Sequence, residues 1–180
     1  MTATKEKLSE AEYFLKRMIE NQTERDAFKF NLSAFLAAFR SVTMIMQKEF
    51  SKYPGFAAWY KTHQDKMKAD DKMKLLNTKR TMTIHQQPVR PRAHINEIVT
   101  EHITLTESVP IVVTPADGTV ERYDSAPPEP PPTPAETETT AQWLWYFEEI
   151  PEIDILTVCQ ECMDKLKTIV SDCERRFGTL

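Results

Sequence analysis

Apolar residues in the first half of the chain recur at intervals of three and four, which is the spacing of a helix with one buried face. The longest stripe spans about six helical turns over residues 28–50 and predicts the central core helix. Its members are Phe28, Leu32, Phe35, Phe39, Val42, Met46 and Phe50. A shorter stripe that starts at Leu8 predicts another helix before it.

Two more helices are predicted after the central one. A Pro-Gly pair at 54–55 ends the central helix, and an aromatic-rich segment opens a third helix over about 56–68. Paired aspartates at 70–71 begin a fourth, because carboxylates accept hydrogen bonds from the free amides of a first helical turn. This helix runs to His85 and ends before Pro88, since proline disfavours helical geometry in the residue that precedes it.

After the fourth helix the pattern changes to a period of two. Polar and apolar residues alternate in HITLTESV, and two strand-like runs flank the turn-forming PADG. This pattern predicts a small antiparallel hairpin or meander inserted at residues 98–124. Six of the twelve prolines then lie between Pro127 and Pro134. Residues 126–140 therefore form an extended Pro-rich linker, with docking to a proline-recognising module as the alternative.

Helical spacing returns in residues 141–180 and predicts a C-terminal helix that completes the bundle. Its apolar stripe comprises Ile155, Cys159, Cys162, Leu166, Ile169, Cys173 and Phe177. The CQEC pair could bind a metal or act in redox chemistry, but three thiols on one buried face are better explained as small hydrophobic residues. The expected fold is mainly α, a single domain over 1–180 with four to five helices and a β insertion.

Composition adds a strong charge asymmetry to this picture. The content of 41% hydrophobic and 28% charged residues is typical of a globular protein with a core. With no export signal or membrane-spanning stretch, we expect a cytoplasmic protein that has no membrane partner. The net charge of -4 combines nine Lys/Arg against seven acids in residues 1–60, nine against three in residues 61–94, and five against seventeen in residues 95–180. The basic stretch is either a solvated helix face or a footprint for a polyanion.

Arg80 and His85 lie in that basic stretch, at the end of the fourth helix. Metal-free RNA cleavage needs a base for the 2′-hydroxyl proton and a cation for the charge that develops on the phosphate. Neutral histidine suits the first task, and arginine suits the second. On a regular helix the two side chains point about 140° apart. They converge only if the helix frays at its end or if a second copy supplies the partner residue.

An arginine followed four to six positions later by a histidine near a helix end resembles the signature of the HEPN superfamily (higher eukaryotes and prokaryotes nucleotide-binding domains). The resemblance covers residues 5–95 and 141–180. It implies a HEPN-like helical bundle, usually a homodimer, whose paired motifs form a metal-independent endoribonuclease site. Many such proteins belong to toxin-antitoxin or defence systems. By this resemblance Arg80 and His85 are the expected catalytic residues.

The first hypothesis is therefore an RNA-acting, HEPN-like homodimer that pairs through the helix of Arg80 and needs no cofactor or metal. Lys79, Arg90 and Arg92 would bind the RNA backbone, and an antitoxin could be its protein partner. Alternatively, Arg80 lays its methylenes along the apolar stripe and pairs with an acid. His85 would then interact favourably with the helix C-terminus, and the two later arginines would belong to an exposed basic loop.

The second hypothesis is a non-catalytic helical protein-interaction module that has no ribonuclease activity. In this interpretation the Pro-rich linker and the acidic C-terminal half contact a protein partner. The two hypotheses differ in salt sensitivity, because nucleic-acid binding through several cations weakens steeply as salt is added. An apolar groove responds much less to salt.

Overall fold

The computed structural model describes residues 1–101, 111–113, 121–123 and 137–178. Within these ranges the chain forms five α-helices and four strands, so the predicted mainly α fold is confirmed. The helices are α1 (Ala3–Glu20), α2 (Arg25–Phe50), α3 (Phe56–Ala69), α4 (Asp71–His85) and α5 (Ile155–Phe177). The chain divides into a helical unit, residues 1–94 and 143–180, and a second unit, residues 95–142.

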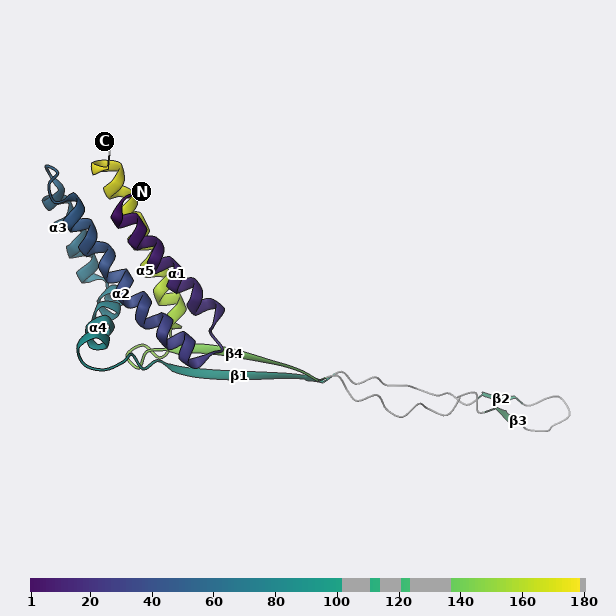
Figure 1. Cartoon of the computed structure of the whole chain (residues 1–180). Coiled ribbons are helices and arrows are strands. Elements are labelled where there is room, and N and C mark those ends of the chain that lie inside the picture. Colours follow the sequence, from purple (N-terminus) through teal and green to yellow (C-terminus); the bar gives the residue numbers. More distant parts are fainter. Residues whose placement is uncertain (102–110, 114–120, 124–136, 179–180) are drawn as a thin grey trace. The chain divides into compact units, whose positions relative to one another are not determined.

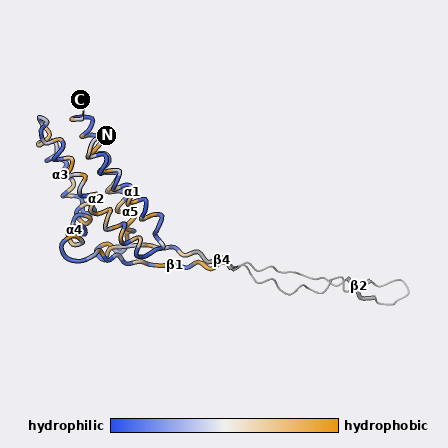
Figure 2. The backbone as a smooth tube through the Cα atoms, viewed as in Figure 1, coloured by the Kyte–Doolittle hydropathy of each residue, from blue (hydrophilic) through white to orange (hydrophobic). Residues whose placement is uncertain are grey.

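The helical unit is built around α2, as the longest apolar stripe predicts. α1 packs along α2, while α4 and α5 contact it from other sides (Figure 1). The stripe residues of α2 are buried except Phe39, which is partly buried against the same core. Hydrophobic and hydrophilic positions alternate along the helices in Figure 2, as expected where each helix buries one face.

The strands form two separate two-stranded sheets. β1 (Arg92–Glu101) pairs with β4 (Thr137–Tyr146). β2 (Ile111–Val113) pairs antiparallel with β3 (Glu121–Tyr123). The predicted strand residues 102–110, the PADG turn and most of the Pro-rich linker lie outside the described residues.

The segment 141–180 differs from its prediction as one C-terminal helix. Its first residues continue β4 as far as Tyr146, and α5 begins only at Ile155. The cause is local, because TETTAQWLWY is rich in β-branched and aromatic residues, which favour strands. Residues 137–140, predicted as linker, belong to the same strand.

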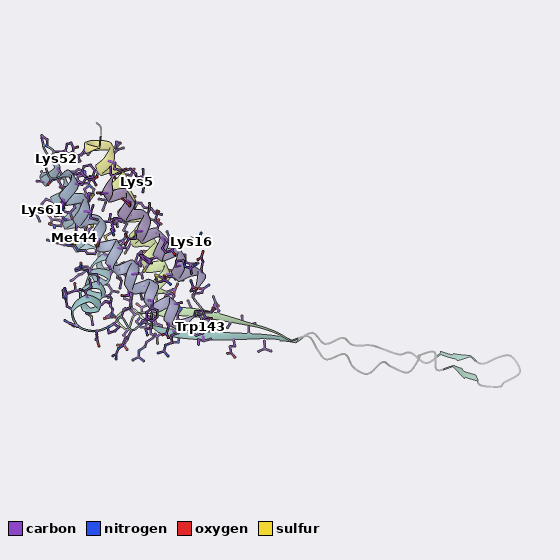
Figure 3. All side chains as sticks on the ribbon, in the orientation of Figure 1. Lys5, Lys16, Met44, Lys52, Lys61 and Trp143 are labelled. Atoms are coloured by element: carbon purple, nitrogen blue, oxygen red, sulfur yellow. The ribbon has the colours of Figure 1, made fainter. Side chains whose placement is uncertain are left out.

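Trp145 joins β4 to the helices. Its indole stacks on the Phe28 ring with a centroid distance of 4.4 Å and an interplanar angle of 8°. Its Nε1 donates a hydrogen bond to the carbonyl oxygen of Gln22, between α1 and α2, at 2.7 Å. Trp143, labelled in Figure 3, is only half-buried and stacks beside Trp145. Trp145 thus links the end of β4 to α2 and to the turn between α1 and α2.

Asp70 caps α4 as the paired aspartates predict. Its carboxylate accepts a hydrogen bond from the Met73 amide at 3.0 Å and pairs with Lys165 of α5. Burial acts to raise the pKa of Asp70, but the hydrogen bonds from Lys165 and Met73 outweigh it and lower that pKa. The ionised carboxylate is therefore the form that stabilises the folded chain.

Asp70→Ala is expected to lower the free energy of unfolding by about 1 kcal/mol, because it removes the N-cap of α4. The control Asp71→Ala lies inside the first turn and should cost less. The lowered pKa means that the Asp70 contribution is full above the unfolded-state pKa of about 4 and is lost as the pH falls through the folded value. Urea denaturation at pH 7 and at pH 3 measures both effects. Equal losses for the two variants at pH 7 would contradict the capping role.

Candidate binding site

The predicted catalytic pair is not brought together within one chain. α4 stays helical through His85, so Arg80 and His85 point about 140° apart. His85 is exposed in the last turn, whereas Arg80 is half-buried. The Arg80 Nε atom is buried and has no hydrogen-bond partner in the part of the chain that the structure describes. The fraying that would let the two side chains converge does not occur, and a catalytic role for them stays a prediction.

Two of the three predicted RNA-binding cations form ion pairs inside the helical unit. The Lys79 Nζ atom lies 2.8 Å from Glu149 and 5.1 Å from the centroid of the Phe147 ring. The hydrogen bond from Lys79 lowers the pKa of Glu149. Arg92 pairs with Glu148, and Arg90 is exposed. RNA contact by these cations stays a prediction.

A pocket of about 320 Å³ lies between α2, α3 and α4, and neither Arg80 nor His85 lines it. Its apolar lining comes from Leu36, Phe39, Met67, Met73, Leu76 and Leu166. Its uncharged polar lining comes from Thr43, Tyr60, Gln64 and Asn77. Its charged lining residues are Arg40, Lys68 and Lys74, one from each helix, and none is acidic. The pocket thus combines an apolar floor with positive charge.

The hydrogen bonds at this pocket leave its positive charge uncompensated. Arg40 donates a hydrogen bond to the hydroxyl of Thr43, one turn further along α2, at 2.6 Å. Gln47 of α2 donates to the Tyr60 hydroxyl of α3 at 3.0 Å. Among the described residues no carboxylate lies within the 4.0 Å ion-pair limit of Arg40, Lys68 or Lys74. This arrangement suits a guest with an apolar body and a negative group.

The residues that line this pocket were only partly predictable from the sequence. Lys68 and Lys74 belong to the basic stretch 61–94, so part of that stretch lines the pocket. Arg40 lies on α2, outside this basic stretch. Its separation from the two lysines in the sequence follows no helical or strand period. Only the packing of α3 and α4 against α2 places the three cations around one opening.

The described residues contain neither a membrane-spanning helix nor a metal-binding cluster. None of the five helices is both long and apolar enough to cross a membrane. No cluster of three or more His, Cys, Asp or Glu side chains with the geometry of a metal site occurs in the described ranges.

A family model described as bacteriophage lambda protein ea47 matches residues 1–180. No curated protein and no solved structure matches the chain. The match overturns the HEPN interpretation and leaves the ribonuclease and toxin-antitoxin roles that it implied without support. The resemblance was wrong because a short Arg-to-His spacing fits many basic helices and carries little information about family.

Proposed function

The chain belongs to the family of bacteriophage lambda protein ea47, and on that premise we propose that it is a non-catalytic helical module that binds an acidic protein segment. The binding site is the pocket between α2, α3 and α4. The observation that supports the proposal is the charge of its lining, where all three charged residues, Arg40, Lys68 and Lys74, are cations beside an apolar floor.

A protein segment suits each part of this pocket. An aliphatic or aromatic side chain would cover the apolar floor, where burial of apolar surface supplies most of the affinity. Glutamate or aspartate beside that anchor would meet the cations and set the specificity. The amides of Gln64 and Asn77 can each donate to and accept from the backbone of an extended segment.

The test is binding of a fluorescently labelled synthetic peptide that alternates glutamate with isoleucine, followed by fluorescence anisotropy. We expect the peptide to bind at low salt and to bind more weakly as salt screens the charges, while the apolar contact keeps some affinity at high salt. A matched peptide with lysine in place of glutamate should not bind. Equal binding of both peptides, or full competition by an RNA oligonucleotide of similar charge, would contradict the proposal.

The double variant Arg40→Ala, Lys74→Ala should weaken peptide binding about tenfold, which corresponds to about 1.4 kcal/mol for two partly exposed charges. The matched control is Lys61→Ala. Lys61, labelled in Figure 3, lies on α3 as Lys68 does, but it is exposed, pairs with Asp65 and does not line the pocket. Loss of binding in the control to the same extent would show that overall charge, and not the pocket, binds the peptide.

A further inference from the structure

The β1 strand carries the chemistry that this pocket is suited to bind. Ile95, Ile98 and Val99 are 48%, 58% and 55% exposed, which is unusual for branched aliphatic side chains clustered in one strand. Glu97 lies among them, and residues 95–101 contain no basic residue. This part of β1 is therefore an apolar, acidic and extended segment.

The sheet itself leaves these apolar side chains uncovered. Ile98 and Val99 are consecutive in a strand, so their side chains point to opposite faces of the sheet. Both are more than half exposed, so neither face is covered at this point. A two-stranded sheet is at best marginally stable in water unless another element packs on it. A partner that covers β1 would stabilise it.

We infer that the occupant of the α2–α3–α4 pocket is the β1 strand of a second copy of this chain. The inference rests on the proposed function, because it names the partner for the same pocket. Residues 95–142 contain nine acids and one base, whereas residues 61–94 contain nine bases and three acids. The strand unit of one copy and the pocket region of another thus carry opposite charge, which favours their encounter and fixes their pairing.

The pocket is large enough for this occupant. A cavity of about 150 Å³ accepts a benzene-sized guest, so about 320 Å³ accommodates the side chain of Val99, which lies on the same face of β1 as Ile95 and Glu97. Each copy offers one strand and one pocket. Two copies can therefore each place β1 in the pocket of the other copy. This reciprocal contact gives a closed dimer with self-complementary interfaces. α4, which carries Arg80, then lies at the interface, as the predicted dimer through that helix requires.

The experiment measures self-association of the full chain by sedimentation over a range of protein concentrations. The parent should form dimers that weaken as salt is added. Glu97→Lys should weaken the dimer about tenfold, because it places a positive charge against the cations of the pocket. Lys74→Glu should do the same by placing a negative charge against the acidic strand. Lys61→Glu makes the same change outside the pocket and should leave the dimer intact.

Mixing the two variants provides the decisive comparison. In a mixture of Glu97→Lys and Lys74→Glu chains, every strand again meets a pocket residue of opposite charge, so dimers should return. The double variant in one chain should dimerise for the same reason. A parent that stays monomeric at every concentration, or variants that dimerise as the parent does, would overturn the inference.

The peptide titration separates this failure from failure of the proposed function. A monomeric parent that still binds the glutamate–isoleucine peptide through Arg40 and Lys74 refutes the second copy as occupant but supports an acidic protein segment. A monomeric parent that binds no peptide refutes both. Circular dichroism of each variant verifies that the helices have formed, since Glu97 and Lys74 are exposed and their replacement leaves the core intact.

Discussion

Replacing Trp145 by alanine is expected to lower the free energy of unfolding by about 3–5 kcal/mol, the range found when a large aromatic side chain is removed from a packed core. Trp145 is 2% exposed, and its ring lies flat on Phe28 near the start of α2. The alanine variant would leave a cavity between β4 and α2 and would lose the stacking contact. Denaturation followed by circular dichroism measures the effect.

Two further variants divide this loss into its parts. Trp145→Phe keeps an aromatic ring but removes the Nε1 donor, which leaves the Gln22 carbonyl without its partner and should cost about 1–3 kcal/mol. Trp143→Ala removes a neighbouring indole that is only half-buried and should cost less than Trp145→Ala. A larger loss for Trp143→Ala would show that the strand is not held to the helices through Trp145.

The helices were predictable because their apolar period records which side is buried. The stripe on α2 and the stripe on α5 both point into the core along their whole length, and Asp70 caps α4 as its position in the sequence indicates. β4 was assigned in part to the last helix. Its apolar run, WLWY, is short, and a short apolar run does not distinguish a strand from a buried helical turn by period alone.

The binding site was harder to predict than the fold, for a physical reason. Arg80 and His85 are close in sequence and share a chemistry, but side chains five residues apart on an intact helix point in different directions. Arg40 and Lys74 are far apart in sequence and meet around one pocket because α2 and α4 pack together. Sequence spacing reports local geometry, whereas a site between helices depends on which faces pack.

Alkylation of the three cysteines at pH 8 is expected to be about a thousandfold slower in the folded chain than in the unfolded chain. Cys159, Cys162 and Cys173 are fully buried on the inner face of α5. Burial raises the pKa of Cys162 and of Cys173 to about 12, from an ordinary value of 9.0, and raises the pKa of Cys159 as well. A rise of three pH units reduces the reactive thiolate about a thousandfold.

The labelling rates with iodoacetamide, in buffer and in concentrated urea, measure this protection. All three thiols should react at the free-cysteine rate in urea and slowly in buffer, where burial shields them and disfavours the reactive thiolate. The prediction also bears on the CQEC pair, because a metal binds the thiolate and a raised pKa disfavours that form. Zinc should therefore leave the labelling rate unchanged. Rapid labelling of Cys159 and Cys162 in buffer, blocked by zinc, would instead favour the metal interpretation over the role of small core residues.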